Sequence, residues 1–307
     1  MFLQDQYNVH FQKIREIYVR VDLLNWQEHK IDEIQGKLKD GSINIDKESA
    51  IRRTCSLDFI LFDDRYIPNP NGYFWLNRKF NLYIGIKSIL TDEIIWFNKG
   101  IYVVDAPNLH YSSDDKNIMI NGLDKMCLYD GTLGGELSNP IIIPVETDIN
   151  EAIESVLTIG GEVKANMDVI NKDTPYTIEI DVDNTLYDAL KELANLYKNW
   201  SEIHFDVNGR FVYRQSKNRI NDPIIWDFSQ TDLTVDYNNE VDFQNIRNHV
   251  AVWGHYWDVD GVQIFAEKEN NNPNSPFSID KIGRRTFPIR DDEIFYEEQA
   301  VEMAEYH

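Results

Sequence analysis

Three residues in the middle of the sequence have the types and spacing of a phosphoryl-transfer site. Asp181, Asp183 and Thr185 precede a helical pattern, as in phosphatases whose first aspartate attacks phosphorus while the second acts as acid and base. The fold of those phosphatases requires a parallel strand after the helix. The segment that follows, Ile203 to Arg214, instead contains Asn208-Gly209 and predicts an antiparallel hairpin. The phosphatase interpretation is therefore disfavoured.

The same aspartates have a structural interpretation. Asp183 or Asn184 is placed to cap a helix from about Thr185 to Asn199, and Asp188 lies in its first turn. Carboxylates at these positions accept hydrogen bonds from backbone N–H groups and favour the positive end of the helix dipole. We predict this role for them.

Adjacent aspartate pairs occur at three places in the sequence and are candidates for an acid and a base. The adjacent pairs are Asp63-Asp64, Asp114-Asp115 and Asp291-Asp292, and each lies in a polar, turn-like context that predicts a solvated loop. Glycosidases hold two carboxylates across a sugar-binding cleft, and the sequence does not indicate which carboxylates would face each other.

Tryptophans are the residues most able to form a platform for a sugar ring. Trp75, Trp96, Trp253 and Trp257 are candidates for it. Packing in the core of a sheet protein is the favoured interpretation, because large aromatic side chains dominate such cores.

Phosphate loops, thiol chemistry and metal binding are also disfavoured. Gly131, Gly134 and Gly135 lack the Lys-Ser/Thr that completes a phosphate-binding loop. Cys55 and Cys127 are too few for a disulfide framework and lie in apolar contexts, so we predict buried free thiols. The seven histidines form no cluster with metal-ligand spacing. We therefore predict no catalytic residue, no cofactor and no metal site.

The composition indicates an acidic protein of two or three domains. The 307-residue chain has a formal net charge of −22 and 42% hydrophobic residues, enough for more than one core. Acidic residues outnumber Lys and Arg in each of the ranges 1–140, 141–235 and 236–307. Nucleic-acid-binding proteins concentrate positive charge instead, so we expect no tight binding to DNA.

Signals for membrane insertion or export are not evident in the sequence. No apolar run reaches the roughly 18 residues of a membrane span. The first residues, MFLQDQYNVHFQKI, do not follow the pattern of a signal peptide. We expect synthesis in the cytosol.

The first 140 residues predict many short strands, a pattern typical of a sandwich or barrel. Strands are expected at Glu16 to Leu24 and at Ile34 to Asp46, the latter with a two-residue hairpin turn at Asp40-Gly41. The segment Arg65 to Tyr73 is expected to be a loop because of its prolines and glycine. Further strands are expected at residues 78–87, 94–97, 100–104, 109–112 and 117–121.

The strand from Arg52 to Leu61 should position the most distinctive polar residues, because its two faces differ. Arg52, Thr54, Ser56 and Asp58 alternate with Cys55, Leu57, Phe59 and Leu61. Successive side chains of a strand point to opposite sides. A sheet with one solvated side produces this pattern, and so does a β-barrel around a water-filled channel.

The rest of the chain predicts a small α+β unit followed by more strands. A helix is expected to begin at Thr147 or Asp148 and to end at Gly160-Gly161. A strand at 176–180 precedes the helix described above, and strands are expected again at 248–254, 262–267 and 284–289. The final helix, from about Tyr296, has no stop signal before His307, so we expect a longer natural protein.

Three segments of the sequence resemble one family of proteins. These are GSINIDKESAIRRTCSL (41–57), GLDKMCLYDGTLGG (122–135) and AEKENNNPNSPFSIDKIGRRTFPI (266–289), the last followed by the acidic helix EEQAVEMAEY (297–306). They are similar to the baseplate hub, or tail tip hub, proteins of tailed bacteriophages and contractile injection systems.

The resemblance implies a mainly β fold with an α+β part. Two related β-barrel tube-type domains are expected at 1–140 and 236–307, the second incomplete at its C-terminus, with a small α+β domain at 141–235. In this family three copies form a ring of six similar barrels.

The resemblance also implies a structural role without enzymatic activity. The expected partners of the homotrimer are the tail tube protein, the distal tail or baseplate proteins and the spike or tip protein. DNA would pass through transiently, without tight binding. The expected location is the virion tail baseplate or tip, after synthesis in the host cytoplasm.

Seven residues in the family-like segments are candidate lumen or intersubunit contacts. They are Arg52, Arg53, Thr54, Ser56, Asp58, Arg284 and Arg285. Adjacent strand residues face opposite ways, so each arginine pair offers one guanidinium to either side, where carboxylates of a neighbouring subunit could bind it.

Two other functions remain open from the sequence. One is a tail-associated cell-wall hydrolase, either a glycosidase or a peptidase. The other is a glycan-binding module in which exposed tryptophans contact the sugar.

Overall fold

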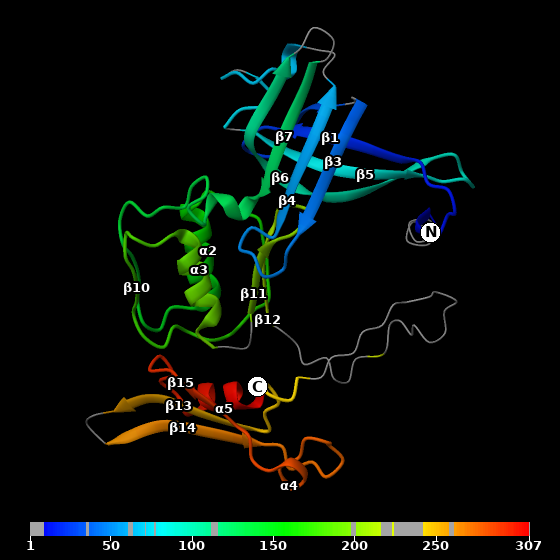
Figure 1. The fold of residues 1–307 in the computed structure, drawn as a ribbon. Coiled ribbons are helices and arrows are strands. Elements are labelled where there is room, and N and C mark those ends of the chain that lie inside the picture. The colour runs from blue at the N-terminus through cyan, green and yellow to red at the C-terminus, as the bar shows by residue number, and fades with distance from the viewer. Residues whose placement is uncertain are drawn as a thin grey trace. The chain divides into compact units, whose positions relative to one another are not determined.

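The computed structural model forms two units, Met1–Leu193 with Ile203–Tyr213 and Ala194–Glu202 with Arg214–His307, and each is described by itself (Figure 1). The residues that the structure describes are 9–34, 37–60, 64–70, 72–76, 78–111, 116–197, 201–215, 223, 242–257 and 261–306.

A seven-stranded antiparallel sheet forms most of the first unit. Its strands, in the order in which they pair, are β2 (Lys30–Ile34), β1 (Ile17–Leu24), β5 (Lys79–Lys87), β6 (Ile94–Tyr111), β7 (Lys116–Asp124), β4 (Arg53–Ile60) and β3 (Lys37–Ile45). One side of the sheet holds a buried apolar core that includes Leu57, Phe80, Tyr102 and Ile118. The apolar face predicted for β4 is confirmed, because Cys55, Leu57 and Phe59 belong to this core.

The predicted closed barrels are not formed by the described residues. β2 and β3 are the two edges of the sheet, and no ladder joins them within the described part of the chain. β2 has five residues and pairs with β1 alone, so the ring of strand pairs stays open. The protein is therefore mainly β with an α+β part, as expected, but its sheets are open.

The turn predicted at Asp40-Gly41 is wrong, because both residues lie inside β3. Gly41 pairs with Leu57, and the register shifts between Leu38 and Asp40, as in a β-bulge. A Cβ on Gly41 would lie 3.1 Å from Leu57 Cδ2. Glycine is therefore needed here because two strands approach closely near a bulge. Besides turns, close backbone approach and bulges are common reasons for glycine in a strand.

The three short strands predicted between residues 94 and 112 form one 18-residue strand, β6. Its register shifts twice, once against β5 between Leu82 and Tyr83, and once against β7 between Asp105 and Asn108. Pro107 lies in the second irregularity, where its missing N–H interrupts no ladder bond. Bulges thus continue the strand where the sequence pattern indicated breaks.

Two small sheets and two helices follow in the same unit. The elements are η2 (Lys125–Leu128), β8 (Ile141–Ile143), α2 (Ile149–Ile159), β9 (Ala165–Met167), β10 (Ile178–Ile180), α3 (Leu186–Asn195), β11 (Ser201–Phe205) and β12 (Phe211–Gln215); a further 3-10 turn, η1, spans Asp64–Tyr66. β10 pairs with β8, and β12 lies between β11 and β9.

The N-cap residue predicted from the sequence is found at one of the two long helices of this unit. The predicted cap of α2 is confirmed, since the Asp148 side chain accepts a hydrogen bond from Glu151 N. The cap predicted for α3 at Asp183 or Asn184 is wrong. Thr185 Oγ1 accepts from Asp188 N while Asp188 Oδ2 accepts from Thr185 N at 2.9 Å, a reciprocal capping box.

The second unit contains a three-stranded sheet covered on one face by a helix. The strand order is β14 (Val262–Glu269), β13 (His249–Trp257) and β15 (Thr286–Arg290). The helix α5 (Glu297–Tyr306) packs Ala300, Met303 and Ala304 against Val250 and Val252 of β13. A short helix, α4 (Ile279–Ile282), precedes β15. The described residues of this unit do not form a barrel.

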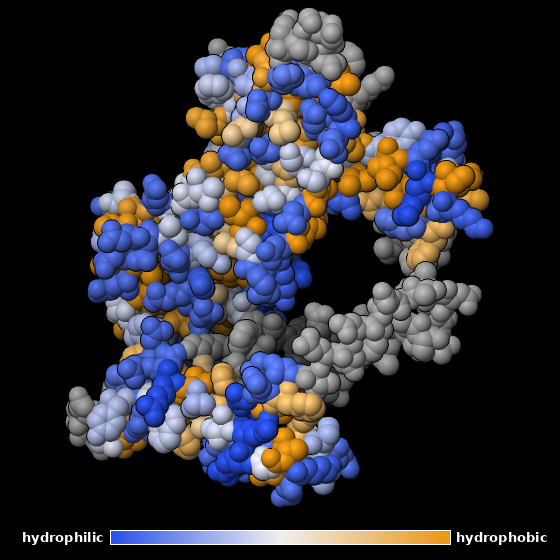
Figure 2. All heavy atoms as spheres, in the orientation of Figure 1, coloured by the Kyte–Doolittle hydropathy of each residue, from blue (hydrophilic) through white to orange (hydrophobic). Residues whose placement is uncertain are grey.

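Hydrophilic residues dominate the visible surface in Figure 2, with smaller apolar patches between them. Among the described helices, none has the length and apolar character needed to cross a membrane.

Candidate functional site

The polar face predicted for β4 is present and extends over its neighbours. Burial alternates along β4, so that Thr54, Ser56 and Asp58 are half-buried while the residues between them are buried. On this face Asp58 lies opposite Asp40 of β3 and Met119 of β7. Directly opposite residues of an antiparallel pair share a face. The β4 residues therefore belong to a surface that spans three strands.

We call this surface the polar face, and its side chains are mainly carboxylates, hydroxyls and amides. Its members, read from the pairing of β3, β4, β7 and β6, include Asp40, Ser42, Asn44, Thr54, Ser56, Asp58, Met119, Asn121, Leu123, Asp105 and Asn108. The three carboxylates give it negative character, which does not favour the binding of phosphate backbones.

Arg53 lies on the buried side of β4, opposite the polar face, as the alternation along the strand predicts. The residue is buried, and its Nη2 donates to the carbonyl oxygens of Phe205 at 2.8 Å and Asp206 at 2.7 Å. Its guanidinium therefore binds the β11–β12 hairpin of the same chain, and its role as a lumen or intersubunit contact stays a prediction.

The other predicted arginines occupy two places. Arg52 is half-buried beside the start of β4. Arg284 and Arg285 are exposed in the second unit, where Arg284 forms an ion pair with Glu269 and Arg285 Nη1 donates to Phe243 O at 2.6 Å. Their contact with another subunit remains a prediction.

A buried ion cluster that the sequence did not indicate joins the seven-stranded sheet to the α+β part. It consists of Glu28, Lys79, Lys125, Glu162 and the more exposed Lys164. Glu28 lies in the β1–β2 turn, Lys79 begins β5, Lys125 begins η2, and Glu162 follows α2. Segments far apart in the sequence therefore meet through charged side chains.

Lys125 is the centre of this cluster. Its Nζ lies 2.5 Å from Glu28 Oε1, forms an ion pair with Glu162 and donates to Gly209 O at 2.8 Å. Its side chain is 2% exposed. Three acceptors thus satisfy its three donors, which is the condition under which a buried ammonium is tolerated.

Glu28 connects the cluster to the β1–β2 turn. Its Oε1 also binds Lys79 Nζ at 3.0 Å, and its Oε2 binds Lys164 Nζ at 2.7 Å. Its backbone has a φ of 65°, a left-handed conformation that is unfavourable for residues with a Cβ.

The charges of the cluster shift the pKa values of its members. Burial acts to raise the pKa of Glu28, but the hydrogen bond and charge of Lys125, with the contributions of Lys164 and Lys79, outweigh it and lower the pKa from 4.5 to about 2. Burial, together with the charge of Lys125, lowers the pKa of Lys79 below its usual value. This arrangement is a set of mutually satisfied ions, which fixes the position of two parts of the unit.

The remaining sequence candidates form no catalytic arrangement in the described residues. Burial raises the pKa of the Cys55 thiol to about 12 and that of Cys127 above its usual range, and both thiols are free and buried, as predicted. No group of three or more His, Cys, Asp or Glu side chains in the described part of the chain could hold a metal ion.

The tryptophans and acidic pairs differ from the predictions in part. Trp75 and Trp96 are half-buried and Trp253 is 36% exposed, so none of these three is a core residue. The side chain of Trp257, the residue Asp63 and the pair Asp114-Asp115 lie outside the described residues. Asp291-Asp292 lies in the turn after β15, as expected for a solvated loop.

The signals that would have indicated the ion cluster are weak in the sequence. Lys125 lies in the family-like segment 122–135, directly after an apolar strand and before Met126 and Cys127. A charged residue between buried residues is a sign of a buried charge, but its partners come from distant segments that no spacing connects.

Comparison with known sequences gives no match. No protein-family model matches the chain, and no curated protein matches it.

Comparison with solved structures shows a similar fold in two tail proteins. The tail protein from Neisseria meningitidis MC58 has a TM-score of 0.52 at 11% identity, with 92% of this chain and 73% of that chain covered. The 43 kDa tail protein of prophage MuSo2 from Shewanella oneidensis has a TM-score of 0.54 at 15% identity, with 94% and 77% covered. The chain therefore has a fold similar to that of these two tail proteins, and its assignment as a hub stays a prediction.

Proposed function

We propose that the protein is a structural component of a tail or tail-like assembly, in which three copies form the hub between the tail tube and the spike or tip. The observation that carries this proposal is the fold, which resembles two tail proteins over more than nine-tenths of the chain. The sequence segments 41–57, 122–135 and 266–289 support the same placement.

The polar face fits this role in its chemistry. A passage for DNA must be hydrated and must not retain phosphates, because neutralised phosphates bind tightly. The polar face offers Asp40, Asp58 and Asp105 with hydroxyls and amides between them. We propose that it lines the shared channel or contacts a neighbouring subunit, together with Arg52, and that Arg284 and Arg285 contact neighbours in the second unit.

The buried ion cluster is consistent with a protein that must stay rigid under force. A hub transmits force between the tube and the spike, so its sheet and α+β part must keep one relative position. Buried ion pairs with complete hydrogen bonding favour one geometry over others. We propose that the cluster keeps the first unit rigid in the assembly.

The mass of the purified particle tests the proposal. We expect a mass three times that of the 36.0 kDa chain, alone or in the presence of the neighbouring tail proteins, measured by light scattering and native mass spectrometry. A chain that remains monomeric under both conditions contradicts the trimeric hub.

A second assay tests the absence of enzymatic activity. Incubation of the chain with purified cell wall is expected to release no soluble fragments. Release of sugars or peptides by this chain would favour the hydrolase instead.

A further inference from the structure

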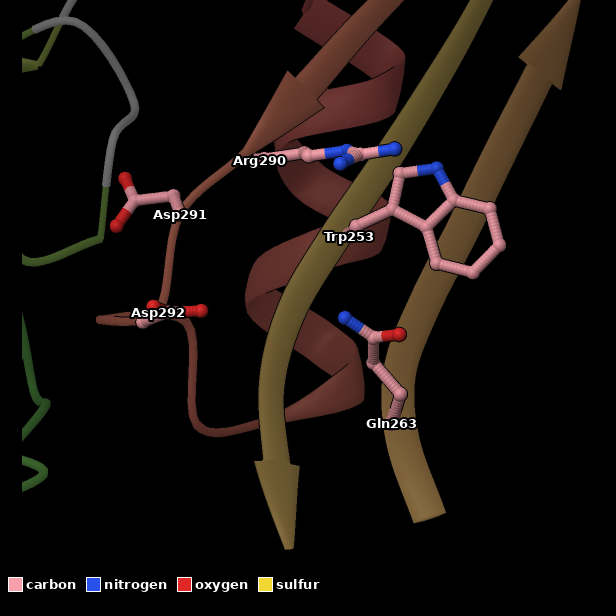
Figure 3. A pocket seen from close by; sticks show the side chains of 5 residues that line it. All are labelled: Trp253, Gln263, Arg290, Asp291 and Asp292. Atoms are coloured by element: carbon pink, nitrogen blue, oxygen red, sulfur yellow. The ribbon is translucent and has the colours of Figure 1, made fainter.

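A pocket in the second unit is not used by the proposed structural role. Trp253, Gln263, Arg290, Asp291 and Asp292 line it, as Figure 3 shows, and its volume is about 480 Å³. This volume falls within the roughly 300–1,000 Å³ of small-molecule sites. The pocket brings together two features that the sequence left without a function, an exposed tryptophan and an acidic pair.

Trp253 forms the apolar wall of the pocket. Its neighbour Val252 packs toward α5, so Trp253 lies on the opposite, uncovered face of the sheet. The indole is 36% exposed, and its ring centroid lies 4.3 Å from that of Phe265, the directly opposite residue of β14. An aromatic ring held by a neighbouring ring offers a flat apolar surface at a low cost in conformational entropy.

Polar groups surround this surface with both donors and acceptors. Gln263 Nε2 donates to Gly254 O at 3.2 Å, which leaves its carbonyl oxygen as an acceptor. Arg290 extends toward Trp253 (Figure 3), and its guanidinium has no hydrogen bond or ion pair with any described residue. A guanidinium carries five N–H donors, to which hydroxyl or carbonyl oxygens of a ligand can bind.

The acidic pair is positioned by its backbone. Asp291 N donates to Trp253 O at 3.0 Å, and Asp291 Oδ1 accepts from Glu293 N at 3.0 Å. The carbonyl oxygen of Asp292 lies 3.2 Å from His255 Nδ1, and in Figure 3 the side chain of Asp292 is directed toward Gln263. The turn is therefore fixed to the sheet. It presents the Asp292 carboxylate at the rim of the pocket, while the Asp291 side chain points away from Trp253 (Figure 3).

We propose that this pocket binds a neutral sugar ring. A pyranose has an apolar face of C–H groups, which matches the Trp253 surface, and a rim of hydroxyls that both donate and accept, which matches Arg290, Gln263 and Asp292. The two carboxylates against one guanidinium, in a chain of net charge −22, disfavour anionic ligands such as nucleic acids or phosphate-rich polymers. A terminal or branching sugar of a surface polysaccharide has the required chemistry.

Titration of the full chain with soluble oligosaccharides tests this proposal. The panel comprises neutral gluco-, galacto- and manno-oligosaccharides, N-acetylhexosamine oligomers, and a uronic acid oligomer, with ligand-detected NMR and tryptophan fluorescence as readouts. We expect at least one neutral or N-acetylated sugar to bind and the uronic acid oligomer not to bind. Trp253→Ala is expected to weaken binding at least tenfold, and Arg290→Ala several-fold.

Tyr296→Ala is the matched control, because Tyr296 is an aromatic residue of the same unit, 50% exposed, that does not line the pocket. This variant should bind like the wild type. Failure of every neutral sugar, or equal binding by wild type and both pocket variants, would overturn the proposal. Binding of the uronic acid oligomer alone would overturn it as well.

The experiment also separates this proposal from protein docking and from the hub. If Trp253→Ala changes the particle mass and no sugar binds, the pocket is a protein contact instead. Because the titration uses the chain alone, sugar binding does not depend on whether the particle is a trimer.

Discussion

Lys125 is the residue on which the buried charge of the first unit depends. Its three N–H donors bind the carboxylates of Glu28 and Glu162 and the backbone carbonyl of Gly209. A buried ion pair adds little net stability relative to a well-packed apolar pair, but the loss of one partner leaves a buried charge without compensation. The cluster is therefore sensitive to the removal of a single member.

Lys125→Ala is expected to lower the free energy of unfolding by about 3–5 kcal/mol, because Glu28 and Glu162 stay buried without their main partner. Urea denaturation at pH 7 measures the loss. Lys164→Ala is the matched control, since Lys164 binds the same Glu28 carboxylate with a side chain that is 47% exposed. Its loss should be about 1 kcal/mol or less. Equal losses for the two variants would mean that burial does not govern this cluster.

Acid should weaken the contribution of Glu28. Its pKa is about 2 in the folded protein against the ordinary 4.5, so the unfolded chain binds more protons between these values. The stability from this carboxylate is complete above about pH 4.5 and is lost as the pH falls toward 2. Glu28→Gln removes the titrating group. The difference in unfolding free energy between wild type and Glu28→Gln, measured by urea denaturation across this range, should shrink on acidification. A difference that stays constant or grows would contradict the assigned shift.

Burial along β4 could be predicted from the sequence, whereas the long-range partners of Arg53 could not. The alternation with apolar residues was sufficient to predict that Thr54, Ser56 and Asp58 of β4 lie on its less buried side. The same alternation could not show that Arg53 reaches Phe205 and Asp206, because that contact spans about 150 positions of the chain. Long-range polar partners are set by tertiary packing, and a single sequence carries no local signal for them.

Among the strands and helices, apolar periodicity and helix-end signals predicted which elements exist better than they predicted where the elements begin and end. The strands β1, β4 and β5 and the helix α2 follow directly from their apolar spacing and from Asp148 and Gly160. The errors at Asp40-Gly41 and along β6 share one cause. Glycine and proline mark turns and bulges alike, and only the opposite strand decides between them. The open edge at β2 likewise depends on pairing that no local pattern specifies.

Gly122 of β7 is a second glycine that serves a close approach. A Cβ at this position would lie 2.5 Å from Phe80 Cζ and 2.9 Å from Cys55 Sγ, inside the core of the seven-stranded sheet. Gly122→Ala is therefore expected to destabilise the protein by about 1–3 kcal/mol through overpacking, as measured by urea denaturation. At Gly134 the nearest atom would lie 3.4 Å away, so Gly134→Ala should change stability by less. A Gly122→Ala variant as stable as the wild type would show that Phe80 can move at no cost.

At the scale of the whole molecule, the two units combine differently built surfaces. The first carries a broad polar face on a large antiparallel sheet, and the second carries a small sheet with one face covered by α5 and a pocket on the other. The acidic composition is spread over all parts of the chain. Under the proposed function, the acidic surface would disfavour binding to DNA that passes the assembly.

Asp58→Lys tests the polar face in the assembly. Asp58 is half-buried on the solvated side of β4, so the exchange should leave the fold intact and change monomer stability by only about 0.5 kcal/mol. Glu154→Lys, an exposed position on α2, makes the same change in net charge and serves as the control.

If the face contacts a neighbouring subunit, Asp58→Lys should reduce the trimer mass in light scattering and Glu154→Lys should not. If the face lines the channel, the trimer should persist and retain DNA in a salt-sensitive manner, because a ring of lysines binds phosphates. An Asp58→Lys particle that assembles and ignores DNA like the control would place the polar face outside both roles.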